Sequence, residues 1–176
     1  MNLSDALPFS EAYWVEPGKF MAGEYPGARY YQTAQKRIQS LIRSGVTLVI
    51  DLTIPGDSVY PYADLLQSEA AEYNTQVTRK NFPIPDYAAP SDKLMSAILD
   101  EIDAQIAAGG VLYVHCLAGI GRTGTVVGCY LARHGYAGWA ALEHIKQLRK
   151  DTSSWLQRSP ESRDQVELIL NWATGK

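Results

Sequence analysis

The feature that most constrains the fold is a short apolar run followed directly by a glycine-bearing loop and a helix start. The run VLYV at 111–114 precedes HCLAGIGRTG at 115–124. A buried strand that turns through such a loop into a helix points successive backbone N–H groups into the loop, and the helix N-terminus adds partial positive charge. The pattern predicts an anion-binding loop at the carboxyl end of a buried strand. We call residues 116–121 the phosphate loop.

Two reactive side chains flank this loop, with Cys116 six positions before Arg122. Cysteine is nucleophilic as the thiolate, which a helix N-terminus and a neighbouring guanidinium stabilise. A guanidinium also matches two phosphate oxygens with its planar fork. We therefore predict that Cys116 is the nucleophile of a phosphoryl transfer. The predicted phosphate-binding residues are Leu117, Ala118, Gly119, Ile120, Gly121 and Arg122.

The neighbouring residues are candidates for supporting roles. Thr123 places a hydroxyl where it can hydrogen-bond Cys116 and help the sulfur to leave, and His115 can brace the loop through backbone carbonyl groups. The second cysteine, Cys129, lies among apolar residues of the following helix and is interpreted as core packing. An inert core residue is the alternative for Cys116 as well, but the glycines, arginine and threonine around it disfavour that interpretation.

Phosphoryl transfer also needs an acid that protonates the leaving oxygen. Asp86 lies in FPIPDYAAP at 82–90, where prolines on both sides predict a stiff, non-helical loop. Asp51 is the rival candidate, because it ends the apolar run VTLVI at 46–50. Its DLT setting is more typical of strand-end hydrogen bonding, so Asp86 ranks first as the acid. An ordinary turn residue is the alternative interpretation of Asp86.

Strand-like and helix-like segments alternate along the chain. One predicted helix begins after the N-cap residue Ser91 and ends at Gly109. The alternation predicts an α/β fold with a mainly parallel sheet, in which ligands bind at the carboxyl ends of the strands. We assign residues 1–12 to an N-terminal tail and residues 13–176 to a single catalytic domain. The other predicted helices are 31–44, 63–73, 121–134, 139–150 and 160–172, and the predicted strands are 46–52, 76–81 and 111–114.

Composition narrows the functional class. The 176 residues are 46% hydrophobic and carry a net charge of −3, which predicts one sizeable core and no nucleic-acid partner. No run approaches the length of a membrane span, and residues 1–10 lack the basic and apolar regions of a signal peptide. Two cysteines fit a reducing compartment, and the three histidines lack zinc-ligand spacing. We expect a cytoplasmic monomer without a membrane partner, metal or cofactor.

The motif His-Cys-x5-Arg-Thr at 115–123, with a Pro-Asp loop at 85–86, resembles the cysteine-based protein phosphatases. The likeness is closest to the small atypical dual-specificity phosphatases and extends over most of the chain. Residues 14–23 are similar to the first strand of that family, and residues 123–130 to the helix behind the loop. The resemblance implies a three-layer protein-tyrosine-phosphatase-like fold with a mainly parallel central sheet flanked by helices. It also implies Cys116 as nucleophile, Arg122 as phosphate binder, and Asp86 as acid and then base.

Two departures from that family bear on the substrate. The tyrosine-specific branch has a tyrosine-recognition loop that this chain lacks, and a glutamine that positions water. Glu161 takes the place of that glutamine in SPESRDQ at 159–165. Lysines that would meet several phosphates are also absent, because the variable loop positions are neutral. These positions are Leu117, Ala118 and Ile120.

The predicted function is hydrolysis of phosphotyrosine, and of phosphoserine and phosphothreonine, through a phosphocysteine intermediate. The expected partner is a phosphorylated protein or a small phosphomonoester. One alternative is the same chemistry on an inositol phosphate, a phospholipid or an RNA 5′-phosphate. Another alternative is a phospho-binding module without catalysis, which the presence of Cys116, Arg122 and Asp86 disfavours.

Overall fold

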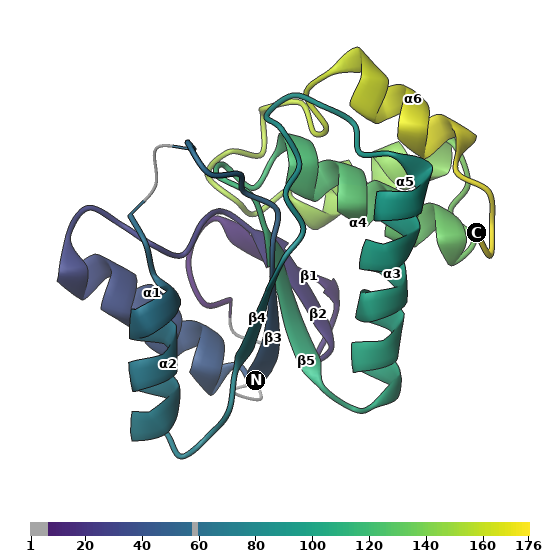
Figure 1. Ribbon diagram of the computed structural model, residues 1–176. Coiled ribbons are helices and arrows are strands. Elements are labelled where there is room, and N and C mark those ends of the chain that lie inside the picture. Colours follow the sequence, from purple (N-terminus) through teal and green to yellow (C-terminus); the bar gives the residue numbers. More distant parts are fainter. Residues whose placement is uncertain (1–6, 58–59) are drawn as a thin grey trace.

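The computed structural model describes residues 7–57 and 60–176 and has an α/β architecture in three layers (Figure 1). A five-stranded sheet with the order β1-β2-β5-β3-β4 forms the middle layer, and helices cover both of its faces. Strands β2, β5, β3 and β4 run parallel, whereas β1 is antiparallel to β2. The predicted α/β fold with a mainly parallel sheet is confirmed. Residues 1–6 of the predicted tail lie outside the described residues.

The first two strands form a hairpin. Strands β1 (Ala12–Glu16) and β2 (Phe20–Gly23) pair antiparallel, and Gly18 has a positive φ of 73° in the turn between them. The single first strand implied over 14–23 is therefore wrong. The chain reverses there because Pro17 restricts its own φ and Gly18 adopts a left-handed conformation without steric cost. Strand β2 then pairs with β5 and leads into a segment beside the phosphate loop.

The three other strands end at one edge of the sheet. They are β3 (Val46–Asp51), β4 (Thr78–Asn81) and β5 (Val111–His115). Asp51 pairs in register with His115 of β5 and with Asn81 of β4. Because parallel strands end at the same edge, the segments that follow them lie close together. The phosphate loop after β5 is therefore next to the segments that follow β3 and β4.

Two helices cover one face of the sheet (Figure 1). They are α1 (Tyr31–Arg43) and α2 (Ala63–Glu72), whose apolar side chains share a core cluster with Met21, Val49 and Tyr113 of the strands. The buried residues of α1 follow the spacing of one helix face, which is the pattern that predicted it. Gly45, at a φ of 85°, follows the last turn and ends the helix as expected.

Four helices cover the opposite face (Figure 1). Their apolar side chains form the larger core cluster together with residues of the strands, such as Phe20, Leu48 and Leu112. Every residue of α4 except Arg133 is buried, so this helix runs through the middle of its layer directly behind the phosphate loop. The four helices are α3 (Asp92–Ala107), α4 (Gly121–Arg133), α5 (Trp139–Leu148) and α6 (Arg163–Asn171).

Side-chain caps set the start of two of these helices. Ser91 Oγ accepts the backbone N–H of Leu94 at 3.2 Å and caps α3, as predicted. Helix α6 begins at Arg163 and not at residue 160, because Ser162 and Gln165 form a capping box. Residues 159–162 therefore form a loop in front of α6, and this loop reaches the first residues of α4.

Candidate active site

The phosphate loop joins β5 to α4 and is held by two other segments. Tyr25, which follows β2, donates its backbone N–H to the carbonyl oxygen of Leu117 at 3.0 Å. The Ser159 hydroxyl, from the loop before α6, donates to the carbonyl oxygen of Ile120 at 2.7 Å. These bonds fix both halves of the loop through its carbonyl groups.

Two glycines give the loop the room that it needs. Gly119 has a φ of 72°, and a Cβ there would lie 2.4 Å from the carbonyl carbon of Gly23 and 2.6 Å from the nitrogen of Glu24. Any side chain would collide with the backbone at the end of β2 and would strain the turn. A Cβ on Gly121 would lie 2.3 Å from Glu161 Oε2. The loop is thus enclosed between the end of β2 and the loop before α6.

Cys116 and Arg122 flank the loop and are almost completely buried, with exposed fractions of 3% and 1%. Arg122 Nη1 donates to Asp57 Oδ2 at 2.7 Å and to the carbonyl oxygen of Ile84 at 3.1 Å. Arg122 Nη2 lies 3.2 Å from Asp86 Oδ1. Two carboxylates from two different segments therefore hold the guanidinium.

The third nitrogen of Arg122, Nε, is buried and has no hydrogen-bond partner among the described residues. Nε and Nη2 form one edge of the guanidinium, and such an edge can bind two oxygens of a phosphate. Burial alone would lower the pKa of Arg122, but its hydrogen bond to Asp57 and the charge of Cys116 raise it above its ordinary value. The side chain is therefore a permanent cation at the end of the loop.

Asp57 is a site residue that the sequence analysis missed. It lies between β3 and α2, its side chain is 10% exposed, and its Oδ2 also accepts the backbone N–H of Ile54 at 3.2 Å. The surrounding TIPGD sequence at 53–57 is that of an ordinary turn and carries no catalytic motif. The available signal was topological, because this segment follows β3, the neighbour of β5 in the sheet.

Asp86, the predicted acid, lies at the mouth of the phosphate loop. It belongs to the segment between β4 and α3, and its side chain is 52% exposed although it contacts Arg122. The buried side chain of Gln165 holds this segment, since its Nε2 donates to the carbonyl oxygen of Ala88 at 3.2 Å. Gln165 Oε1 accepts two backbone N–H groups from the loop before α6. Asp86 is thus close to the cation yet accessible to a substrate.

Asp51, the rival acid, is fully engaged at the end of β3. Its Oδ1 accepts the N–H and the hydroxyl of Thr53 at 2.8 and 2.6 Å, and its Oδ2 accepts two bonds from Arg79 at 3.0 and 2.6 Å. Burial alone would raise the pKa of Asp51, but the adjacent His115 and these hydrogen bonds lower it below its ordinary value. The buried carboxylate has the hydrogen-bonding role that its strand-end position indicated.

His115 lies beneath the phosphate loop and is fully buried. Its Nδ1 is 3.0 Å from the carbonyl oxygen of Cys116, and its Nε2 is 2.6 Å from the Tyr62 hydroxyl. Burial lowers the pKa of His115, although the nearby Asp51 opposes this shift. The ring therefore braces the loop as a neutral group, and the predicted contact between His115 and a loop carbonyl is present.

The two remaining candidate residues, Thr123 and Cys129, both lie in α4. The Thr123 hydroxyl is buried in the first turn of α4 and has no hydrogen-bond partner among the described residues, so the predicted bond to Cys116 is not formed here. Cys129 is fully buried in the core, and burial raises the pKa of its thiol well above the ordinary value. Both cysteines are free. Core packing is therefore confirmed for Cys129.

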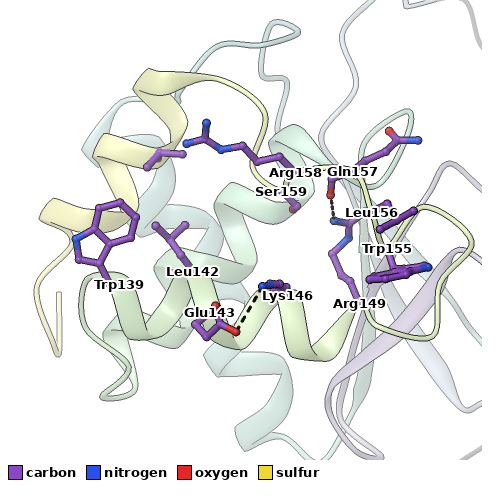
Figure 2. A pocket seen from close by; sticks show the side chains of 11 residues that line it. Trp139, Leu142, Glu143, Lys146, Arg149, Trp155, Leu156, Gln157, Arg158 and Ser159 are labelled. Atoms are coloured by element: carbon purple, nitrogen blue, oxygen red, sulfur yellow. Dashed lines mark hydrogen bonds and ion pairs between the residues drawn. The ribbon is translucent and has the colours of Figure 1, made fainter.

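A cavity of about 460 Å³ lies between α5 and the segment 155–159 (Figure 2). Its apolar lining is made of Trp139, Leu142, Trp155, Leu156 and Val166. Arg149 supports the wall, because its Nη1 donates to the carbonyl oxygen of Gln157 at 2.9 Å (Figure 2). Gln157 also lines a second cavity, of about 340 Å³, that reaches Ala118 of the phosphate loop. The larger cavity is therefore separated from the loop by one segment and does not include Cys116.

The arrangement brings together a buried cysteine, a fixed guanidinium, an accessible carboxyl group and the N-terminus of a buried helix. Among residues 7–57 and 60–176, no group of three or more His, Cys, Asp or Glu is placed to hold a metal ion. No helix in the described part of the chain is both long and apolar enough to cross a membrane. Chemically, the site can bind a phosphate, attack it with sulfur and protonate a leaving oxygen.

Comparison with known proteins links this site to a family. Residues 10–167 match the family PTP-SAK, described as Swiss Army Knife protein, DSP-PTPase phosphatase domain. The phosphatidylglycerophosphate phosphatase PTPMT2 of Arabidopsis thaliana is 34% identical over 117 residues, which are 65% of this chain and 48% of that protein. The dual specificity protein phosphatase CDC14B of Mus musculus is 42% identical over 50 residues, which are 28% of this chain and 10% of that protein.

The chain spans less than half of the length of these two relatives. Among solved structures, kinase associated phosphatase with serine at its catalytic site cysteine is similar over the whole fold. It has a TM-score of 0.72 and 16% identity, and the match covers 93% of each chain. At this identity the likeness establishes the fold alone.

Proposed function

The chain belongs to the DSP-PTPase phosphatase domain family of cysteine-based phosphatases, and on this premise we propose that it hydrolyses phosphotyrosine, phosphoserine and phosphothreonine in proteins. The family predicted from the sequence is confirmed, and membership in it supports the hydrolysis of phosphate esters. The observation that carries the proposed mechanism is the junction of β5 and α4, where Cys116 precedes a guanidinium held by Asp57 and Asp86.

Substrate binding uses the phosphate loop and one edge of Arg122. The loop N–H groups and the α4 N-terminus bind the phosphate oxygens, and Nε and Nη2 of Arg122 form the fork. Nε has no protein partner among the described residues, whereas Nη2 contacts Asp86. The incoming phosphate therefore replaces Asp86 at Nη2, and Asp57 keeps Nη1 in place. Asp57 is in this sense a positioning residue.

In the first step, the Cys116 sulfur attacks phosphorus. The S–P bond forms while the bond from phosphorus to the leaving oxygen breaks, and Asp86 gives its proton to that oxygen. Once the phosphate has displaced Asp86 from Arg122, the freed carboxylate takes a proton from solvent water and delivers it to the leaving oxygen. The developing charge on the phosphoryl oxygens is stabilised by donors that are already in place, which is the main source of rate acceleration in such sites.

In the second step, a water molecule attacks the phosphocysteine. The Asp86 carboxylate takes a proton from the water, a new P–O bond forms, and the S–P bond breaks to return the Cys116 thiolate. The Thr123 hydroxyl donates a hydrogen bond to the departing sulfur. Its lack of any other partner among the described residues supports this role, because the hydroxyl proton is not committed elsewhere.

A non-protein phosphomonoester is the second candidate substrate. It is favoured by the relative named phosphatidylglycerophosphate phosphatase, which is 34% identical over 117 residues. Phosphorylated proteins are supported by the relative named dual specificity protein phosphatase. They are also supported by the exposed and uncharged side chains at the loop mouth, Leu117 and Ala118.

A substrate panel tests the proposal. The wild-type chain is assayed on phosphotyrosine, phosphoserine and phosphothreonine peptides and on phosphatidylglycerophosphate in mixed micelles, with Cys116→Ser as the control. We expect the highest kcat/KM on phosphopeptides, a phosphoenzyme that is trapped by rapid quenching, and neither turnover nor phosphoenzyme for Cys116→Ser. A higher kcat/KM on the lipid would make the second candidate correct, and turnover by Cys116→Ser would contradict catalysis by this thiol.

A further inference from the structure

We infer that Glu161 is a specificity-determining residue that selects phosphomonoesters with neutral or cationic surroundings and disfavours a second phosphate beside the scissile one. The inference rests on the proposed phosphatase function and narrows its substrate class. It concerns the loop before α6, which the catalytic steps do not use. Three observations carry it: the place of Glu161, the charges that face it and the other sides of the loop mouth.

The carboxylate of Glu161 lies against the start of α4. Its Oε2 would be 2.3 Å from a Cβ on Gly121, the first residue of the helix. Gln165 fixes the backbone of this loop by accepting the N–H of Glu161 at 3.1 Å. Since the same Gln165 side chain donates to Ala88 in the segment of Asp86, Glu161 is placed between the general acid and the phosphate loop.

The charges that face Glu161 leave it without a dedicated cation. Among the described residues, no Lys, Arg or His lies within ion-pair distance of it, although it is partly buried. Arg122 of α4 is held by other carboxylates, and Arg149, which follows α5, donates to the segment 154–157. Burial and the charge of Asp86 raise the pKa of Glu161, which the Gly121 N–H and both arginines partly offset.

A second anion next to the scissile phosphate meets this charge in a site of low dielectric. Two like charges a few ångströms apart repel strongly where water is partly excluded, and the repulsion weakens with added salt. A neutral or cationic neighbour has no such penalty. Glu161 therefore discriminates among substrates without taking part in the bonds that form and break.

The other sides of the loop mouth carry different charges. Glu11 and Glu24 line the cavity of about 340 Å³ that reaches Ala118, so this side is also acidic. The cavity that reaches Leu117 is lined by Arg29, together with Arg37, which is paired with Glu24. A second phosphate is therefore rejected on the side of α6 and tolerated toward Arg29. The order of the two phosphates along a peptide decides which side the second one meets.

The test uses three peptides and two variants. One peptide carries a single phosphotyrosine, and the two others carry a second phosphotyrosine immediately before or after it. For the wild type at low salt, we expect kcat/KM on one of the two doubly phosphorylated peptides to be roughly tenfold lower than on the singly phosphorylated peptide. Glu161→Gln reduces that penalty to about threefold or less, and Glu161→Lys removes it or turns it into a preference.

Glu167→Gln is the matched control, because Glu167 is an exposed carboxylate of α6 paired with Arg163 and should change nothing. The affinities of the same peptides for Cys116→Ser and for Cys116→Ser/Glu161→Gln measure the discrimination without turnover. This result does not depend on whether the proposed phosphatase activity is correct. An unchanged penalty in both Glu161 variants would overturn the inference. So would a tenfold loss of kcat on the singly phosphorylated peptide with accumulation of phosphoenzyme, which would place Glu161 in the hydrolysis step.

Discussion

The polar groups behind the phosphate loop and those in front of it are organised differently. Behind the loop, Asp51 and His115 are fully buried, and each oxygen or ring nitrogen has a partner in the protein. In front of it, Asp86 and Glu161 lie on segments without regular structure and are partly exposed. Both regions contain carboxylates near the same loop, but only those in front can exchange partners.

The difference shows which carboxylates stabilise the fold and which take part in catalysis. A buried carboxylate with all of its hydrogen bonds made cannot bind a substrate without leaving another group unpaired, and that loss is costly. Asp86 loses only one contact with Arg122 when a phosphate arrives, and it remains solvated. We therefore expect changes behind the loop to alter mainly stability and changes in front of it to alter mainly catalysis.

The largest effect should come from Asp86→Asn. Because an acid matters most when the leaving oxygen is basic, we expect kcat on a phosphotyrosine peptide to fall roughly 10²–10⁴-fold. On an aryl phosphate with an acidic phenol the loss should be much smaller. Steady-state kinetics on both substrates, across pH, checks this and should show that the alkaline limb of kcat/KM disappears. If Asp51→Asn instead loses much more kcat on the peptide than on the aryl phosphate, the general acid lies behind the loop. The division between structural carboxylates behind the loop and catalytic ones in front of it would then be wrong.

Arg122→Lys should lower kcat by about 10²-fold on both substrates, because an ammonium cannot reproduce the fork that Nε and Nη2 present. Its effect should not depend on the leaving group, which separates it from Asp86→Asn. Vanadate binding, measured by competition, should weaken in parallel. A lysine variant that retains more than about a tenth of the activity would reduce Arg122 to a structural residue.

Asp57→Asn tests the positioning role assigned to the carboxylate at Nη1 of Arg122. The amide keeps the shape but loses the charged hydrogen bond of 2.7 Å, so the guanidinium is held less firmly. We expect kcat/KM to fall roughly tenfold on the peptide and on the aryl phosphate alike. The thermal midpoint of unfolding should change little. A loss confined to the basic leaving group would instead identify Asp57 as the acid.

The smallest effect on activity should come from Asp51→Asn, behind the loop. Replacing the carboxylate weakens its bonds with Arg79 and should lower the free energy of unfolding by about 2 kcal/mol at neutral pH. The pKa of Asp51 is lowered in the folded state, so its contribution is present above the unfolded value, about 4, and is lost as pH falls through the folded value.

Urea unfolding of the wild type and of Asp51→Asn from pH 7 to pH 3 checks this prediction. The difference in unfolding free energy between the two should shrink toward the acidic end of the range. kcat on the aryl phosphate should stay within a few-fold of the wild type wherever both proteins are folded. A constant difference across the range would mean that Asp51 contributes no charge-dependent stability.

The sequence by itself determined the parts of the molecule that depend on neighbours along the chain. The apolar spacing in 31–44 indicated α1, and Ser91 marked the start of α3. The contiguous segment from His115 to Thr123 contained the whole phosphate loop. In each case the decisive contacts join residues a few positions apart, so the periodicity, the caps and the glycines carry the information locally.

Only the tertiary structure decided which distant side chains meet at the loop. Asp57 contacts Arg122 from 65 positions away in the sequence. Arg79 of β4 pairs with Asp51 of the neighbouring strand β3, and Glu161 reaches the start of α4. The later start of α6, at Arg163, leaves Glu161 in the loop that makes this last contact. These long-range contacts depend on the order of the strands and on how the helices pack against them. No local pattern records that order, because the same short turn sequence fits any edge of a sheet.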